Sequence, residues 1–212
     1  RPELSVSYIM TDGGALPLSF SRSVTFLKEK GLIHGTITFG QAFGGDFETV
    51  NIYTALIAAC EVLKSDIAIV TMGPGITGTG TKYGFSGIEQ GPIIDAVNTL
   101  GGRPIFIPRI SFGDNRKRHC GISHHSVTVL KEIAKTQAEV VIPLMDEAKM
   151  NFIKTQIVEN ELDKRHKIVY VEESDKILEN LSRFEFKLST MGRGIESERE
   201  FFITAGAAGL FA

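Results

Sequence analysis

The sequence predicts an α/β protein of Rossmann-like type, a three-layer sandwich in which helices cover a mainly parallel sheet of about six strands. Two observations carry this prediction. Short apolar runs rich in β-branched residues alternate with helical patterns along the whole chain. Several of these runs are almost entirely apolar, as is typical of strands covered on both faces.

Six apolar runs are expected to form the strands. They lie at 4–10, 33–39, 66–72, 103–110, 138–144 and 166–172. Each is followed by a polar or glycine-rich segment, and a helical pattern precedes the next run. Six such units in series favour right-handed crossovers within one sheet.

The helical patterns carry recognisable ends. The first ends at Gly31, the second is expected to begin with Asp46 as its N-cap, and the fourth opens at Ser123. Cys60 lies in the second pattern and is expected to be a small core residue. The others cover 88–102, 146–162 and 174–184, and a helix rich in alanine and glycine ends the chain. We expect one domain over residues 1–212, the C-terminal part of a longer protein.

Composition excludes several classes of partner. The net charge is −2, so there is no overall basic surface for nucleic acid, and no apolar run is long enough to span a bilayer. The two cysteines suggest a reducing compartment, so a cytoplasmic location is expected. The apolar tail "FFITAGAAGLFA" predicts a homo-oligomer, most simply a two-fold dimer.

The stretch "GPGITGTGTKYGFSGIEQG" at 73–91 follows the third strand. Ligands bind outside the carboxyl ends of parallel strands, and unshielded glycine N–H groups before a helix suit an anion. Neither the dinucleotide nor the P-loop fingerprint has the right spacing here. A lid-like loop with turn glycines is the alternative. The candidate ligand-binding residues are Gly73, Gly75, Gly78, Thr79, Gly80, Thr81, Lys82 and Glu89.

The loop after the fourth strand gathers ionisable side chains in "DNRKRHCGISHH". Three kinds of chemistry are open: a metal site, an activated thiolate at Cys120, and an oxyanion clamp formed by arginines. The spacing H-x4-H-H matches no familiar metal motif, and neighbours on a helix point about 100° apart, so we expect His124 and His125 not to face one ligand. Anion binding by Arg116 and Arg118 is therefore favoured, and no metal is assigned.

Further acids and one more arginine complete the candidates. Asp12 and Asp46 follow the first two strands and could act as bases or as turn and cap residues. Arg193 lies between glycines near the end of the chain. The candidate catalytic residues are Asp12, Asp46, Asp114, His119, His124 and His125.

Three long strings resemble a bacterial family catalogued as domain of unknown function 3866: "GPGITGTGTKYGFSGIEQGPIIDAVNTLGGRPIFIPRISFGD", "RHCGISHHSVTVL" and "STMGRG". The resemblance covers most of the chain. It implies a bacterial, cytoplasmic protein whose relatives carry an additional N-terminal part. It also implies that many relatives have another residue at Cys120, which weakens the thiolate interpretation. No activity is assigned to the family, so it supplies no catalytic residue.

Two functions follow as hypotheses. The first is an enzyme that acts on a small anionic or phosphorylated substrate at the carboxyl edge of the sheet, where the glycine-rich and His/Arg loops should be neighbours. The second is a non-catalytic ligand-binding or assembly module in which the glycine-rich loop and the tail make subunit contacts. The sequence identifies no cofactor.

Overall fold

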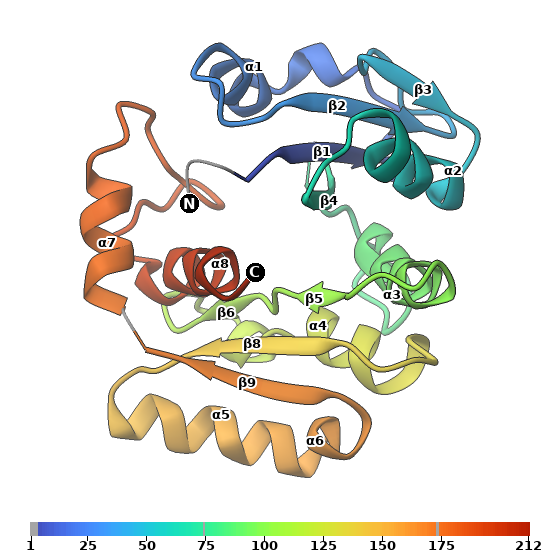
Figure 1. Cartoon of the computed structure of the whole chain (residues 1–212). Coiled ribbons are helices and arrows are strands. Elements are labelled where there is room, and N and C mark those ends of the chain that lie inside the picture. Colours follow the sequence, from blue (N-terminus) through green and yellow to red (C-terminus); the bar gives the residue numbers. More distant parts are fainter. Residues whose placement is uncertain (1–3, 74, 173) are drawn as a thin grey trace. The chain divides into compact units, whose positions relative to one another are not determined.

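The structure is a computed structural model that describes residues 4–73, 75–172 and 174–212. It divides into two compact units, Arg1–Leu100 and Gly101–Ala212, which we call unit 1 and unit 2. The elements are labelled in Figure 1. Each unit has a parallel sheet with helices, which confirms the α/β class; a single sheet of six strands is not what the structure shows.

Unit 1 is built on a four-stranded parallel sheet in the order β3-β2-β1-β4. Its strands are β1 (Val6–Thr11), β2 (Gly35–Phe39), β3 (Phe47–Thr49) and β4 (Ile67–Met72). The helices are α1 (Arg22–Glu29), α2 (Ile52–Ile57), which continues as a π-helical turn to Val62, and α3 (Gln90–Thr99), with short 3-10 turns at Leu18–Phe20 and Ser86–Glu89.

Alternation along β1 places helices on both faces of this sheet. Tyr8 and Met10 pack with Val24 of α1, whereas Ile9 packs with Ala55 of α2 on the other face. Successive strand side chains point to opposite faces, which explains why every residue from 7 to 11 is buried. The prediction that this run is covered on both faces is therefore confirmed.

The second helix departs from the prediction. It begins at Ile52 with Asn51 as its N-cap, and the segment after Asp46 forms β3 instead. Asp46 is not a cap, because its carboxylate accepts hydrogen bonds from the backbone N–H and hydroxyl of Thr36. The expectation for Cys60 is also wrong: Ala55 and Ala59 form the buried stripe, and Cys60, one position further round the helix, is exposed.

Unit 2 contains the three-stranded parallel sheet β5-β8-β9 and the antiparallel pair β6-β7. The strands are β5 (Ile105–Phe106), β6 (Ile110–Ser111), β7 (Gly121–Ile122), β8 (Glu139–Pro143) and β9 (Lys167–Val171). The helices are α4 (His124–Thr128), which continues as a π-helical turn to Ile133, α5 (Glu147–Glu159), α6 (Leu162–Arg165), α7 (Ser174–Ser182) and α8 (Arg199–Phe211), with a 3-10 turn at Lys117–His119.

The predicted strand at 103–110 is split. Pro108 has no N–H to donate to a ladder and restrains the residue before it, so β5 ends at Phe106 and β6 starts afresh at Ile110. β5 pairs with β8, whereas β6 turns away to pair with β7. This break carries the chain into the loop that holds the histidines.

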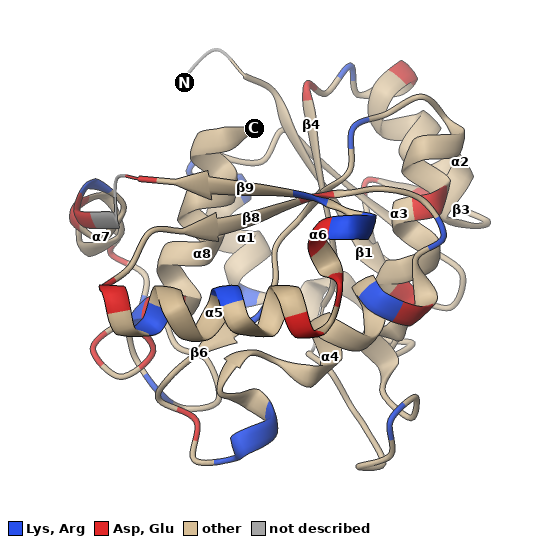
Figure 2. Ribbon diagram, turned by 90° about the horizontal axis from the view of Figure 1, so that it is seen from below, with Lys and Arg blue, Asp and Glu red and all other residues tan. Residues whose placement is uncertain are grey.

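The tail helix α8 is buried within unit 2. Ile203, Ala207 and Ala208 pack with Val141 of β8 and Ile177 of α7. Figures 1 and 2 show α8 and α5 on opposite sides of β8 and β9. The apolar residues of the tail, which suggested a dimer, therefore pack within their own unit. The dimer stays a prediction, but burial of the tail no longer supports it. None of the helices in the described part of the chain is long and apolar enough to span a membrane.

Candidate functional site

At the carboxyl edge of the unit 1 sheet, the loops after three strands meet. The Asp12 carboxylate accepts a hydrogen bond from the N–H of Gln41 at 2.8 Å, so the loops after β1 and β2 are joined. The hydroxyl of Thr11, at the end of β1, donates to the carboxylate of Glu89, which occupies the N-cap position of α3. Burial raises the pKa of Glu89, and the nearby charge of Asp12 raises it further. These acids hold loops together at the edge where a ligand was expected.

Asp46 lies in a structural network. Its carboxylate accepts from Thr36 and forms an ion pair with Lys28 at 2.6 Å. Burial acts to raise the pKa of Asp46, but the hydrogen bonds from Lys28 and Thr36 prevail and lower it. A carboxylate with three donors around it has little basicity left, so the arrangement favours anchoring over catalysis.

For several glycines of the glycine-rich stretch, packing against neighbouring residues leaves no room for a Cβ atom. Thr77 and Ser86 are linked by hydrogen bonds, and the N–H of Thr79 donates to the carbonyl of Gly84 at 2.7 Å, so the stretch folds back on itself. A Cβ at Gly84 would overlap the hydroxyls of Thr79 and Thr81.

Four other glycines of the stretch are of two kinds. Gly75 and Gly80 have φ of 99° and 81°, in the left-handed region, and face open space. Methyl groups at Gly73 and Gly87 would meet Met10 and Ile76. The stretch is thus an ordered loop in the described residues, and its role towards a ligand stays a prediction. The same holds for its expected proximity to the His/Arg loop, which lies in unit 2.

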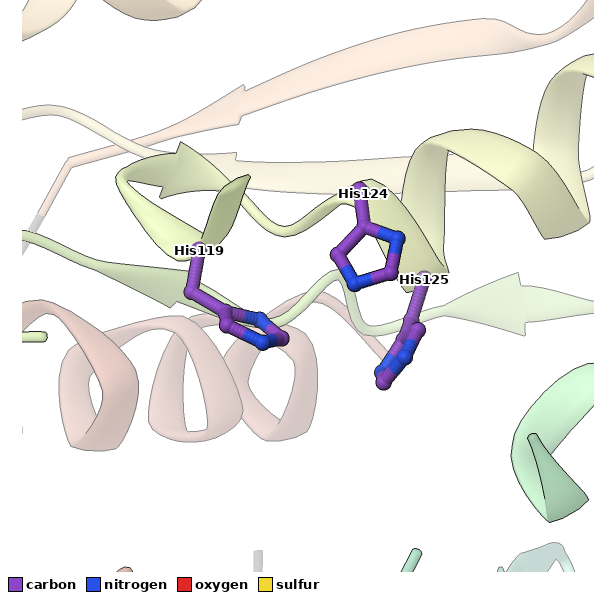
Figure 3. Close-up of side chains that lie close together, drawn as sticks. All are labelled: His119, His124 and His125. Atoms are coloured by element: carbon purple, nitrogen blue, oxygen red, sulfur yellow. The ribbon is translucent and has the colours of Figure 1, made fainter. Parts of the chain in front are cut away.

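In unit 2, β6, β7 and the start of α4 bring three histidines together. His119 ends the 3-10 turn before β7, while His124 and His125 open α4 (Figure 3). The ring centroids of His119 lie 4.9 Å from His124 and 5.3 Å from His125, and those of His124 and His125 are 4.1 Å apart. One ring nitrogen of each lies within 4.8 Å of the others. The expectation that His124 and His125 diverge is therefore wrong.

Local hydrogen bonds hold this arrangement. Ser123, as predicted, caps α4, and its buried hydroxyl also lies 2.8 Å from Nδ1 of His119. From α5, the Gln156 side chain accepts the N–H of Ile122 and donates to the carbonyls of Cys120 and Ile122. Gly121 has φ of 67°, and a Cβ there would strike Gln156. β7 is thereby fixed between two histidines that are close in space.

Arginines surround the histidines. Arg116 grips Asp114 with two hydrogen bonds of 2.9 and 2.7 Å, and Arg193 reaches the same carboxylate at 3.3 Å. Arg193 also pairs with Glu198, which is fully buried. These hydrogen bonds with Arg116 hold the pKa of Asp114 far below its usual range, despite its burial. Two of the arginines predicted to bind an anion thus have carboxylate partners.

Arg109 and Arg118 lack such close partners among the described residues. The Arg109 side chain lies over the ring of Phe201 and donates to Thr190, with Asp114 4.0 Å away. Its Nη2 is buried and finds no hydrogen-bond partner in the part of the chain that the structure describes. The N–H and carbonyl of Arg109 are bonded to Ser126 and Ser123 at the start of α4. Arg118 is exposed, and its Nε lies 3.4 Å from Nε2 of His119.

All three imidazoles are kept neutral. Burial lowers the pKa of His119 to about 4, with help from the charge of Arg116. Burial, together with the other two histidines, lowers that of His125 to about 4, and burial and Arg118 lower that of His124. At neutral pH each ring therefore carries a lone pair.

Four buried polar atoms in this region have no hydrogen-bond partner in the described residues: Nη2 of Arg109, Oγ of Ser111, Nε2 of His124 and Oε2 of Glu198. Buried polar atoms are nearly always satisfied, and each exception requires an explanation. A bound molecule, ion or water would supply one.

The cluster and the rest of the chain match one family model, described as a protein of unknown function (DUF3866), over residues 1–209. The chain belongs to this family. Comparison with curated proteins and with solved structures gave no match. For this DUF3866 member the site must therefore be interpreted from its own residues.

Sequence reasoning found Asp114, His119 and Arg193 but missed the groups that organise them. Ser123 was assigned as a cap, without its second role towards His119. Glu198 and Arg109 carried no sequence signal, because a charged residue in a polar tail or beside a strand is ordinarily solvated. Cys120 lies beside His119 in the chain and is half-buried, and no interaction with another described residue activates its thiol.

Proposed function

We propose that unit 2 binds a small anionic molecule at the cluster of His119, His124, His125 and the surrounding arginines, and that the protein is an enzyme acting on this molecule. The observation that supports this proposal is the balance of positive and negative side chains around the cluster. Among the described residues, Arg109, Arg116 and Arg193 share two carboxylates, Asp114 and Glu198. Arg118 adds a fourth positive charge next to the three imidazoles, which are neutral. The excess positive charge favours an anion.

The residues divide into two roles. Arg116 and Arg193 are fixed by carboxylates, so they give the site its shape. Arg118 is exposed and close enough to lower the pKa of all three imidazoles, so its guanidinium is the one best placed to receive an oxyanion. A neutral imidazole beside the bound anion can accept a proton, as a general base does.

The experiment is a thermal-shift and calorimetric titration of the full chain with orthophosphate, pyrophosphate and small phosphorylated or carboxylated metabolites. A ligand at a hundred times its Kd adds about 2.7 kcal/mol to the free energy of unfolding. Arg118→Ala should weaken binding roughly ten- to hundredfold, because a charge-assisted contact is worth about 1.5–3 kcal/mol.

Arg183→Ala is the matched control, since Arg183 is exposed on unit 2 and its guanidinium pairs with Glu179 outside the cluster. If no anion stabilises the wild type, or if Arg118→Ala and Arg183→Ala respond alike, the anion site is refuted. If the anion binds but is never turned over in a product assay, the protein is a binding module and the enzymatic part of the proposal fails.

A further inference from the structure

We infer that His119, His124 and His125 together bind one divalent transition-metal ion, zinc being the ion that their chemistry fits best, and that they leave a coordination position open. The three side chains come from two segments on either side of β7 and point toward one another (Figure 3). The inference goes beyond the proposed anion site, because it uses ring nitrogens and needs no arginine.

The separation of the ligand atoms is close to that of a metal site. One nitrogen from each ring lies within 4.8 Å of the other two. Around tetrahedral zinc with Zn–N bonds of about 2.0–2.1 Å, ligand nitrogens lie about 3.3 Å apart. The remaining difference is about 1.5 Å at most, which small rotations about the side-chain bonds can close.

Hydrogen bonds hold the His119 imidazole in a tautomer that can bind a metal through Nε2. Its Nδ1 faces the Ser123 hydroxyl at 2.8 Å, and its Nε2 lies 3.4 Å from an N–H of Arg118. Nε2 is thus the acceptor, so Nδ1 carries the proton and donates it to Ser123. Metal-bound histidines ordinarily donate their second N–H to such a partner, which fixes the tautomer and the ring orientation.

His124 supplies an independent observation. Its Nε2 is buried and has no hydrogen-bond partner within the described residues. A buried polar atom without a hydrogen-bond partner destabilises a folded protein, so such atoms are rare and each calls for an explanation. Because the ring faces His119 and His125, a metal ion between the three would engage this nitrogen.

The donor set indicates the kind of metal. Three imidazole nitrogens without a carboxylate suit zinc and its neighbours in the transition series, and not magnesium or calcium, which take oxygen ligands. Structural zinc sites have four protein ligands, whereas sites with three leave a position for water or substrate. The oxygen of an anion held by Arg118 could occupy that position.

Arg118 also opposes the ion, since its positive charge lies close to all three rings. Its side chain is exposed and its hydrogen bond to His119 is long, so it can move into solvent. Removing it should therefore tighten metal binding while it weakens anion binding. These opposite signs separate the two proposals.

The test uses the untagged full chain, stripped of metal and kept in phosphate-free buffer. Zn²⁺ is titrated in competition with a chromophoric chelator, and Co²⁺ is added to a second sample to record its visible ligand-field absorption. We expect one ion per chain, intense Co²⁺ bands of a four- or five-coordinate centre, and a loss of affinity of about a hundredfold or more for His119→Ala, His124→Ala and His125→Ala. Arg118→Ala should bind Zn²⁺ more tightly than the wild type.

His34→Ala is the control, because His34 is exposed in unit 1. A folded wild type that takes up no Zn²⁺, or that gives only the weak Co²⁺ bands of the hydrated ion, overturns the inference. So does equal Zn²⁺ affinity of the wild type and the three site variants. Should an alanine variant fail to fold, the Co²⁺ spectrum of the wild type still decides.

Discussion

The hydroxyl oxygen of Ser123 lies 2.8 Å from Nδ1 of His119, and the same oxygen caps the helix that carries His124 and His125. One buried side chain thus links the two segments of the histidine cluster. It orients the first ring and begins the helix that presents the other two. Loss of this hydroxyl should have two separate effects, one on metal affinity and one on the stability of the fold.

Ser123→Ala should lower the Zn²⁺ affinity about tenfold or more, because ligand-orienting partners typically contribute ten- to hundredfold. It should also destabilise the protein by about 1 kcal/mol, the usual effect of a lost N-cap. Competition titration and thermal unfolding measure the two effects.

Asp146→Ala is the matched control for Ser123→Ala. Asp146 caps α5, where its side chain accepts from the N–H of Lys149, and it lies outside the cluster. It should reduce stability without changing Zn²⁺ affinity, and Ser123→Thr should restore both properties. Equal Zn²⁺ affinities of Ser123→Ala and the wild type would show that the hydroxyl does not position His119.

The ion pair of Arg193 and Glu198 should be strongly coupled. Glu198 is fully buried, and two guanidinium nitrogens lie 2.6 and 2.5 Å from its Oε1. Glu198→Ala should destabilise the protein by about 3–5 kcal/mol, because it breaks a buried ion pair and leaves the Arg193 guanidinium with only its longer contact to Asp114. In a double-mutant cycle, Arg193→Ala should then add little. Additive effects in that cycle would contradict the coupling, and urea unfolding measures it.

Glu89→Gln should stabilise unit 1 at neutral pH. Burial raises the pKa of the Glu89 carboxyl, so ionising it is harder in the folded chain than in the unfolded one. The folded state is therefore penalised fully above the raised pKa of the folded chain, and the penalty fades as pH falls through that pKa towards the unfolded one. Glutamine keeps an oxygen that can accept from Thr11. We expect a Tm rise of about 1–4 °C at pH 7.5 that vanishes near pH 4.

Glu48→Gln is the control for that experiment, since Glu48 is exposed in the same unit. A Tm difference for Glu89→Gln that is the same at both pH values would show that ionisation of Glu89 is not its cause.

The glycine-rich stretch should depend on its glycines for its own folding. Gly84→Ala would press a methyl group against the hydroxyls of Thr79 and Thr81, and Gly80→Ala would impose a strained φ. Each should destabilise the protein by about 1 kcal/mol or more. Urea unfolding is the measurement. If both variants keep wild-type stability yet lose anion affinity, the glycines serve a ligand and not the loop.

Runs of apolar residues were sufficient to predict most strands. Val6–Thr11, Ile67–Met72 and Glu139–Pro143 lie where the patterns place them. The first and the third are almost wholly buried, because a strand covered on both faces needs an unbroken apolar run. The second is the edge strand of its sheet, and its Ile69 and Thr71 are exposed. The strand at 103–110 failed because its pattern includes Pro108, whose effect on the ladder outweighs the apolar pattern. Which strands pair in the same sheet depends on contacts between residues that are distant in sequence, and the periodicity of a single run contains no information on such contacts.

The histidine cluster shows what spacing alone misses. Neighbours on a helix do point about 100° apart, but an imidazole reaches several ångströms from the backbone, so two rings can converge on a group between them. His119 is brought to that point by the turn through Gly121 and β7. The sequence contains all three residues, but the hairpin that joins them rests on Gln156, more than thirty residues away.

The most direct test of the metal centre is a crystal of the full chain, grown without phosphate, soaked in Zn²⁺ and measured at the zinc absorption edge. The account predicts one strong anomalous peak about 2.0–2.1 Å from a nitrogen of each of His119, His124 and His125, with a non-protein ligand in the remaining position. The absence of a peak there, while the three rings are clearly defined, would contradict it.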